Sequence, residues 1–515
     1  MSSSLTTVLD LLEAGVSGAT ALSTPGGAPL TYKALRQLAR DTLSALNVKG
    51  IGRNDRVAIV LDNGPEMAAA FVSVAAGATA APLNPGYRAD EFEFYLNDLN
   101  AKLLIIEQDK ASPAIDVASK LGIPIARVAT AREHGAGGYT LIFPEGQVAL
   151  PSARLGPASA DDIALVLHTS GTTSRPKIVP LAQRNVCASA RNVRRTLGFA
   201  ATDRGLNIMP LFHIHGLIAG ILAPLSAGGQ VCCTTGFNAL KFFSWMAEVH
   251  PTWYTAVPTM HQAILSRAAN NVDVIKANPL RFIRSSSSSM PIQVIRELEA
   301  VFGAPVIESY GMTEAAHQMA SNPLPPDVRK PGTVGVHAGP EVCVIDLDGN
   351  PVAPGVAGEI AIRGENVMSG YENNQKANAE AFTKGWFRTG DQGVMDADGY
   401  LTITGRLKEI INRGGEKISP REVDEVLMDH PAVQQCVTFA VPHEKLGEEV
   451  AAAVVLREGV QANEKELREF AAKRVADFKV PRKILIVAEI PKGATGKLQR
   501  IGLAQKLGLA PEKAS

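Results

Sequence analysis

The sequence predicts an α/β protein with a large N-terminal domain of doubly wound sheets and a small C-terminal α+β domain. Three observations support this fold class. The chain has 515 residues, more than one hydrophobic core usually organises. Helix-like and strand-like segments alternate over residues 1–330, and the density of charged residues rises after residue 406. We therefore predict an N-terminal domain at residues 1–406 and a C-terminal domain at residues 407–515.

Within the first domain, the alternation of helices and strands is typical of mostly parallel sheets. The apolar runs at residues 56–61 and 253–257 predict buried strands, and the longer segments at 32–46 and 291–302 predict helices. Strands and turns become short and frequent at residues 332–405, which predicts an antiparallel, barrel-like subdomain. After residue 407 the alternation continues on a smaller scale, as a separate α+β domain requires.

Composition restricts the kinds of partner that this chain can have. Lys+Arg and Asp+Glu both number 51, so the formal net charge is zero, which argues against nucleic acid or an anionic membrane as a partner. The longest apolar stretches, 67–83 and 217–225, are better interpreted as buried core than as membrane spans. Five cysteines without a Cys-x-x-Cys motif, no secretory signal and no C-terminal Ser-Lys-Leu together predict a cytoplasmic location.

A hydroxyl-rich loop at residues 167–177 is the first candidate binding element. It follows a strand-like run and contains Thr169, Ser170, Gly171, Thr172, Thr173, Ser174, Arg175 and Lys177. Short side chains let backbone N–H groups approach an anion, and Arg and Lys add positive charge. A flexible surface loop has a similar composition, and the Gly-Lys-Ser/Thr ending of a Walker A loop is missing. The loop by itself therefore leaves both interpretations open.

Two later segments contain candidate ligands for the rest of a nucleotide. Residues 310–314 read Tyr-Gly-Met-Thr-Glu, and Glu314 is a hard oxygen ligand suited to Mg²⁺. Asp391 follows a glycine at the end of residues 386–391 and can accept hydrogen bonds from ribose hydroxyls. A helix start and a turn aspartate are the corresponding structural alternatives.

Three further segments combine reactive or basic residues with glycine. His213 and His215 would share one side of a strand, but without a nearby third His or Cys ligand a pocket wall or a packed histidine is favoured over zinc. Residues 405–417 contain two adjacent glycines flanked by Arg and Lys, which suits either a bound ligand or a surface hairpin. Lys497 ends a Gly-rich segment from which an ammonium group can reach a phosphate or carboxylate, or stay solvated.

In order and spacing, these motifs resemble those of the adenylate-forming superfamily, which includes acyl-CoA synthetases, 4-coumarate:CoA ligases, adenylation domains of peptide synthetases and beetle luciferases. The resemblance covers essentially the whole chain, with matched motifs at residues 169–177, 310–314, 389–391, 405–408 and 492–497. Ser174 departs from the glycine that the family usually has, and Asn412 stands where luciferases and coumarate ligases have a second lysine.

The resemblance implies a two-step reaction that joins a carboxylic acid first to AMP and then to CoA, with ATP and CoA as co-substrates and Mg²⁺ as the metal. The implied ATP-binding residues are Thr169, Ser170, Gly171, Thr172, Thr173, Lys177, Ser309, Tyr310, Gly311, Asp391 and Arg406. The implied catalytic residues are Lys497, Thr313, Glu314 and His213, of which Glu314 also holds Mg²⁺. The small domain is implied to swing about the hinge residue Lys408 and to bring Arg413, Gly414 and Gly415 toward CoA.

The implied substrate pocket is unusually polar. Its residues are His215, Arg284, Ser286, Ser287 and His317. Burying such groups costs roughly several kcal/mol unless a ligand satisfies them, so we expect a small polar acid with two carboxylates. Several segments, among them residues 168–177 and 210–217, also resemble oxalate-activating ligases of the superfamily. In the alternative, Arg284 points away and the serines line only a backbone turn.

Two other functions stay open within the same motifs. One is a ligase for a medium-chain or aryl acid. The other is an adenylation enzyme that loads a separate carrier protein, because no carrier domain follows within the 515 residues. Zero net charge offers no support for a membrane-associated or RNA-associated second role.

Overall fold

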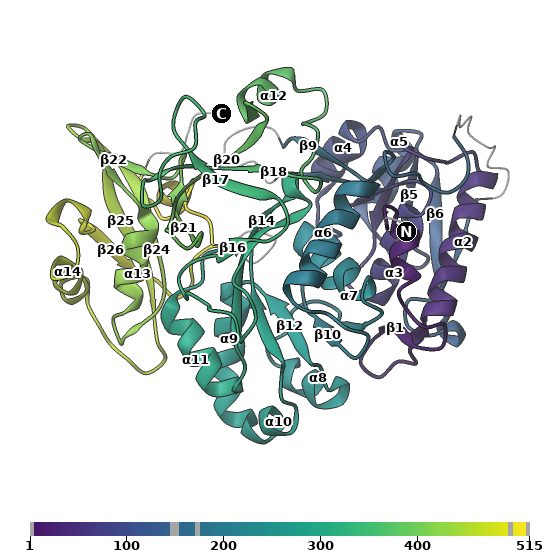
Figure 1. Ribbon diagram of the computed structural model, residues 1–515, viewed down its shortest axis with the longest axis horizontal. Helices are drawn as coiled ribbons and strands as arrows, with labels where there is room; N and C mark the ends of the chain where they lie inside the picture. The colour runs from purple at the N-terminus through teal and green to yellow at the C-terminus, as the bar shows by residue number, and fades with distance from the viewer. Residues whose placement is uncertain (1–4, 145–153, 170–175, 493–497, 511–515) are drawn as a thin grey trace.

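The computed structural model describes residues 5–144, 154–169, 176–492 and 498–510. Two large sheets with their helices form the N-terminal part, and the C-terminal strands and helices form a separate group at the opposite end of the molecule (Figure 1). Among the helices of the described residues, none combines the length and apolar composition that a membrane span needs.

The first large sheet has seven strands and a parallel centre. Its order is β7 (Tyr139–Ile142), β6 (Ile125–Thr130), β5 (Leu103–Glu107), β3 (Arg56–Val60), β4 (Thr79–Pro82), β8 (Ile163–His168), β9 (Ile178–Ala182). Only the pairs at its two edges are antiparallel. Successive residues of β3 contribute to two different cores, with Val57 and Ile59 on one face and Ala58 and Val60 on the other. Helices α2 (Tyr32–Val48) and α3 (Pro65–Ala75) cover the first face, and α4 (Ala89–Asp98) and α5 (Pro113–Lys120) cover the second. The strand predicted at residues 56–61 is therefore present, and it lies in the centre of this sheet.

The second large sheet has nine strands. Its order is β16 (Val336–His337), β15 (His317–Ser321), β14 (Val306–Met312), β13 (Phe282–Ser285), β12 (Trp253–Ala256), β10 (Arg204–Asn207), β11 (Gln230–Cys233), β1 (Thr20–Ser23), β2 (Leu30–Thr31). The strands from β14 to β1 are parallel, and the outer pairs are antiparallel. Its helices are α6 (Gln183–Thr196), α7 (Ala223–Leu225), α8 (Phe242–Val249), α9 (Pro258–Ala268), α10 (Val272–Ala277) and α11 (Ile292–Phe302). The short helix α1 (Val8–Leu12) contacts α2, α3 and α6. A π-helix, η2 (His215–Leu222), precedes α7 and is buried throughout.

Residues 341–406 form the antiparallel sheet that the short strands predicted. Its strands are β17 (Glu341–Ile345), β18 (Gly358–Arg363), β19 (Phe382–Thr383), β20 (Trp386–Met395) and β21 (Leu401–Arg406), with α12 (Gln375–Ala381) before β19. The long strand β20 pairs with β18, β19 and β21, so it joins all parts of this sheet except β17. Asp391 consequently lies within a strand instead of at a strand end.

The C-terminal residues form a fourth sheet, of mixed strand directions, with helices on both faces. Its strands are β22 (Ile411–Arg413), β23 (Glu416–Ile418), β24 (Val433–His443), β25 (Gly447–Leu456) and β26 (Lys483–Ile486). Helices α13 (Pro420–Met428) and α14 (Glu464–Ala472) share one core, and α15 (Leu503–Lys506) packs on the other face. This α+β arrangement agrees with the short alternating helices and strands predicted for residues 407–515.

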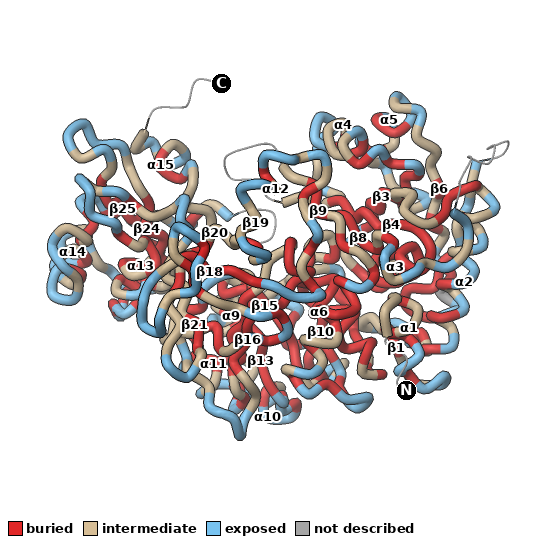
Figure 2. Tube along the Cα trace, turned by 45° about the horizontal axis from the view of Figure 1, so that its top comes forward, coloured by how far each residue is buried: buried red, intermediate tan, exposed pale blue. Residues whose placement is uncertain are grey.

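The C-terminal group packs against the second large sheet. Gln262 on α9 donates to the carbonyl oxygen of Gln434 at 3.0 Å, and Arg457 pairs with Glu297 on α11 at 3.1 Å. One hydrophobic core continues from α9 and α11 into α13 and β24. Figure 2 shows buried chain running through both groups, with exposed loops around them. The division at residues 406 and 407 stays our prediction for the domain boundary.

Candidate active site

Part of the predicted site lies where the two large sheets meet. A cavity of about 80 Å³ opens at the carboxyl ends of β4 and β8 and is lined in part by Leu83, His168, Phe212, His213 and Thr313. Crevices at the carboxyl ends of parallel strands are the usual ligand sites of such sheets. A second cavity, of about 310 Å³, also contacts Phe212 and extends toward the ends of β3 and β11. Two segments of the predicted site, the hydroxyl-rich loop and Thr313, therefore border one space.

Strands β8 and β9 hold the two ends of the hydroxyl-rich loop together. The backbone N–H of Thr169 donates to the carbonyl oxygen of Lys177 at 3.0 Å, and the N–H of Lys177 donates to the Thr169 hydroxyl at 3.2 Å. The Lys177 ammonium lies 4.3 Å from the centre of the Tyr371 ring. The remaining predicted loop residues, Ser170, Gly171, Thr172 and Thr173, lie outside the described residues, as does the departing Ser174.

Glu314 is a buried carboxyl group beside this loop. It lies in the short helix η4 (Thr313–Ala315), and the Tyr371 hydroxyl donates to its Oε1 at 2.8 Å. Burial raises the pKa of Glu314, and the hydrogen bond from Tyr371 opposes that rise. Asn366 fixes the backbone around it by donating to the carbonyl oxygens of Ala315 and Gln318. The single carboxylate of Glu314, next to the loop, fits a magnesium ion whose other ligands come from phosphates and water.

Tyr310, Asp391 and Arg406 form the next group. The Tyr310 hydroxyl donates to Asp391 Oδ2 at 2.5 Å, and Arg406 Nε lies 3.2 Å from Asp391 Oδ1. Pairing of β20 with β21 places Asp391 directly opposite Arg406. Burial and the adjacent carboxylate raise the pKa of Tyr310 well above its ordinary value, so its hydroxyl keeps its proton. The two motifs, 81 residues apart in the chain, therefore share one hydrogen-bonded cluster.

Gly311 allows β14 and β15 to approach each other beside this cluster. A Cβ atom at Gly311 would lie 1.8 Å from the carbonyl oxygen of His317. The neighbouring Ser309 is buried, and its carbonyl oxygen accepts the Ser286 hydroxyl at 3.1 Å. The predicted adenine segment and the serine run are thus in direct contact.

Arg284 is fully buried at the end of β13, between two histidines. Its Nη1 donates to His215 Nε2 at 3.2 Å, and its Nη2 donates to His317 Nε2 at 3.0 Å. Gln318 Oε1 and Thr255 Oγ lie at 3.3 and 3.5 Å. The two imidazole rings stack with their centres 4.9 Å apart. Because a guanidinium only donates, both Nε2 atoms accept, which places the ring protons on Nδ1. We call Arg284, His215 and His317 the arginine clamp.

The arginine clamp contains a cation that the surrounding protein does not neutralise. Within the described residues, no Asp or Glu forms an ion pair with Arg284, and its buried Nε has no hydrogen-bond partner there. Burial lowers the pKa of Arg284 to about 9. A buried charge is costly unless it is paired, so the clamp is an incomplete anion site.

Backbone strain is concentrated around the clamp. Ser287, Ala316 and His317 have φ values of 73°, 47° and 104°, in the region that favours glycine. Such conformations cost of order 1–3 kcal/mol each and persist where the surroundings demand them. Here they direct Ser287 Oγ to within 3.0 Å of His215 Nδ1 and turn His317 toward Arg284.

The structure separates the two histidines that the sequence placed side by side. The two histidines do not share one side of a strand, because His215 begins the π-helix η2. His213 lines the smaller cavity with Thr313, whereas His215 contacts Arg284 and Thr255. Among the residues that the structure describes, no group of three or more His, Cys, Asp or Glu side chains could hold a metal by itself.

The predicted hinge and CoA residues lie in the C-terminal part of the chain. Lys408 is exposed in the turn between β21 and β22. Gly414 and Gly415 form the tip of the β22–β23 hairpin with φ values of 60° and 99°, and Arg413 pairs with Glu449 at 2.7 Å. Lys497 lies outside the described residues, so its role stays a prediction.

Sequence reasoning missed Tyr371, Gln318, Asn366 and Thr255, which hold the predicted residues in place. None of the four lies in a motif that suggests its role. Each depends on contacts between distant segments, for which the sequence contains no local signal.

Two family profiles match the chain. The AMP-binding enzyme profile matches residues 13–372, and the profile of the AMP-binding enzyme C-terminal domain matches residues 422–497. The protein therefore belongs to the AMP-binding enzyme family, the adenylate-forming superfamily that the motifs predicted.

Individual relatives cover nearly the whole chain. It is 46% identical to an oxalate–CoA ligase of Arabidopsis thaliana over 94% of this chain and 95% of that protein. It is 42% identical to an oxalate–CoA ligase of Saccharomyces cerevisiae over 88% and 87%. The crystal structure of ATP-bound MatB from Rhodopseudomonas palustris has a TM-score of 0.86, with 27% identity over 96% of this chain and 97% of MatB.

Proposed function

We propose that this protein is an ATP-dependent ligase that joins oxalate to CoA, forming oxalyl-CoA, AMP and pyrophosphate. The observation that supports the choice of acid is the arginine clamp. Its buried guanidinium has no carboxylate partner among the described residues, and a second carboxylate on the substrate would supply one. The oxalate–CoA ligases among the relatives support the same choice.

The first half-reaction joins the acid to AMP. One carboxylate oxygen of the acid attacks the α-phosphorus of ATP, the bond to the β-phosphate oxygen breaks, and pyrophosphate leaves. In this proposal Asp391 accepts hydrogen bonds from the ribose, while Tyr310 and Arg406 hold its carboxylate. Glu314 is the residue that would hold Mg²⁺, which when bound neutralises phosphate charge. The protein provides positioning and charge stabilisation here and forms no covalent bond to the substrate.

The second half-reaction transfers the acyl group. The CoA sulfur attacks the adenylate carbonyl, the carbon–oxygen bond to the phosphate breaks, and AMP leaves. The two cavities on either side of Phe212 offer a route by which a long thiol-bearing arm could approach Thr313. In this proposal, the C-terminal group turns about the exposed Lys408 after AMP transfer and brings the Gly414-Gly415 hairpin toward CoA.

The acid specificity follows from the same contacts. Arg284 offers N–H groups in one plane, and the two histidines fix the direction of its guanidinium. A monocarboxylic acid with an alkyl or aryl group would leave this cation buried and unpaired. A medium-chain or aryl acid is therefore a poorer fit than a short diacid.

Release of AMP and pyrophosphate tests this function against a panel of acids, with and without CoA. The panel contains oxalate, malonate, sulfoacetate, acetate, hexanoate and 4-coumarate, so that charge and length vary separately. We expect CoA-dependent turnover with oxalate and a value of kcat/KM at least roughly a hundredfold lower with acetate, because an unpaired buried charge costs about 3 kcal/mol. Turnover with hexanoate or coumarate but none with oxalate would refute the proposal. Oxalate-dependent pyrophosphate exchange without CoA turnover would instead indicate an enzyme that loads a carrier protein.

A further inference from the structure

Arg500 lies at the centre of a charged network inside the C-terminal group. Its Nε donates to the carbonyl oxygen of Thr438 at 3.1 Å, and its Nη2 pairs with the Asp424 carboxylate. Asp424 is buried and also accepts the backbone N–H of Thr438 at 2.5 Å. These contacts attach residue 500 firmly to α13 and β24.

A second carboxylate near Arg500 belongs to the hinge turn. Glu409 follows Lys408 directly, and its Oε2 lies 3.6 Å from Arg500 Nη1. The backbone N–H of Glu409 donates to the carbonyl oxygen of Arg406 at 2.9 Å, which closes the turn that contains Lys408. Arg500 therefore connects the hinge turn to the core of the C-terminal group.

Charges of alternating sign continue from this turn to the nucleotide site. Asp391 lies 3.2 Å from Arg406 and is the main cause of the raised pKa of Arg406, to which Glu409 also contributes. The series is Asp391, Arg406, Glu409, Arg500 and Asp424. A rotation about Lys408 would separate Arg406 from Glu409 but would leave the Glu409–Arg500 pair intact, because both of its members follow the hinge.

Arg500 also lies three positions after Lys497 in the chain. We propose that Arg500 is a positioning residue for the adenylation half-reaction. Through Glu409 and Asp424 it makes the hinge turn and the segment that leads out of Lys497 move as one unit. The inference rests on the proposed function. Without the pair, the hinge turn would be joined to that segment only through the rest of the C-terminal group, and a misplacement of about 1 Å can cost roughly a hundredfold in rate.

The test compares the two half-reactions in variants of the full-length protein. Oxalate-dependent ATP–pyrophosphate exchange reports adenylation, and CoA-dependent release of AMP from pre-formed oxalyl-adenylate reports thioester formation. Glu409→Gln is the main variant, because it weakens the pair and leaves the buried Arg500–Asp424 contact in place. Arg500→Gln and Arg500→Lys follow. Arg474→Gln is the matched control, since Arg474 is exposed and contacts Phe470.

We expect Glu409→Gln to lower kcat of exchange by roughly tenfold, with KM for ATP and oxalate and the rate of CoA transfer within about twofold of wild type. Arg500→Gln should lower kcat of exchange further, and Arg500→Lys should have a kcat between those of Arg500→Gln and wild type. Exchange within about twofold of wild type in Glu409→Gln overturns the inference. A parallel loss of both half-reactions with a lower melting temperature also overturns it and assigns Arg500 a structural role. If wild-type protein shows no exchange with oxalate, the proposed function fails separately, and the same variants are compared with whichever acid supports exchange.

Discussion

We propose that one part of the site binds the nucleotide and another part binds the acid, and these two sides treat buried charge in opposite ways. On the nucleotide side, the carboxylate of Asp391 has Tyr310 and Arg406 as partners, and Glu314 has Tyr371. On the acid side, the buried Arg284 has only neutral partners among the described residues. The first set is complete before a ligand binds, and the second needs an anion to complete it.

This difference separates what ATP contributes from what the acid contributes. Completed hydrogen-bond sets keep their geometry at little cost, so the residues on the nucleotide side are already arranged before ATP binds. An unpaired buried cation lowers the stability of the protein, and the protein regains that stability only when a matching anion binds. Specificity for the acid should therefore depend on Arg284 far more than on the nucleotide residues.

The largest expected effect is that of Arg284→Met. Removing the guanidinium should lower kcat/KM for oxalate by roughly a thousandfold, about 4 kcal/mol, because the second carboxylate loses its charged partner. The melting temperature without ligand should stay the same or rise, since an uncompensated buried charge is removed. Steady-state kinetics and thermal unfolding with and without oxalate measure both effects.

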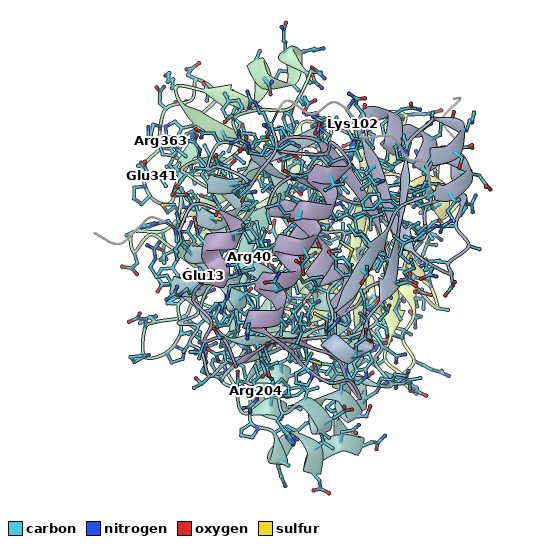
Figure 3. The ribbon with its side chains drawn as sticks, turned by 90° about the vertical axis from the view of Figure 1, so that its right-hand side faces the viewer. Glu13, Arg40, Lys102, Arg204, Glu341 and Arg363 are labelled. Atoms are coloured by element: carbon cyan, nitrogen blue, oxygen red, sulfur yellow. The ribbon has the colours of Figure 1, made fainter. Side chains whose placement is uncertain are left out.

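Arg363→Met is the matched control for that variant. Arg363 pairs with Glu341 across β17 and β18 at 2.7 Å, and both side chains lie at the edge of the molecule (Figure 3). An exposed pair of this kind contributes little, so its loss should change kcat/KM by less than about twofold. Oxalate kinetics within about threefold of wild type in Arg284→Met, together with a lower melting temperature, would show that the clamp only supports the fold.

The sequence predicted the nucleotide side better than the acid side, for a physical reason. Tyr310 and Asp391 belong to short motifs whose chemistry can be recognised locally. Arg284 was expected in the pocket, but its histidine partners come from segments 69 and 33 positions away and meet it only after folding. Tyr371 had no local signal at all, because its contact with Glu314 depends on the chain returning to β9.

The fold shows the same limit. Apolar runs predicted strands such as β3, because a strand buried on both faces must be largely apolar. The order of the strands could not be predicted in this way. The N-terminal strand β1 joins the second large sheet beside β11, a pairing of residues about 200 positions apart for which no local pattern exists.

Asp391→Asn tests the nucleotide side with an intermediate effect. The asparagine keeps the shape but loses the ion pair with Arg406 and one charged acceptor for the ribose. We expect KM for ATP to rise by roughly tenfold or more, since hydrogen bonds to a charged group contribute about 1.5–3 kcal/mol, while KM for oxalate changes little. Initial rates at varied ATP and varied oxalate separate the two constants. Asp398→Asn, in the exposed turn after β20, is the control; a rise in KM for oxalate as large as that for ATP would contradict the division of the site into two sides.

The smallest expected effect on activity comes from a buried acid that is neutralised by its own proton and acts on stability. Glu308 lies on β14 close to Tyr310, and burial raises its pKa to about 8, although Gly332 N–H donates to it at 2.9 Å. The folded protein therefore holds a proton that the unfolded chain, with a pKa near 4.5, has released. This extra bound proton stabilises the folded state, and the stabilisation is fully present below pH 4.5 and is lost as pH rises through 8. Glu308→Gln should remove this dependence, so its melting temperature relative to wild type should increase from pH 6 to pH 9, by an amount worth at most about 3 kcal/mol. Glu444→Gln, at an exposed position, should show no such trend. Parallel curves for wild type and Glu308→Gln would mean that Glu308 is ionised at neutral pH, and that the nucleotide side also contains a buried charge that depends on a partner.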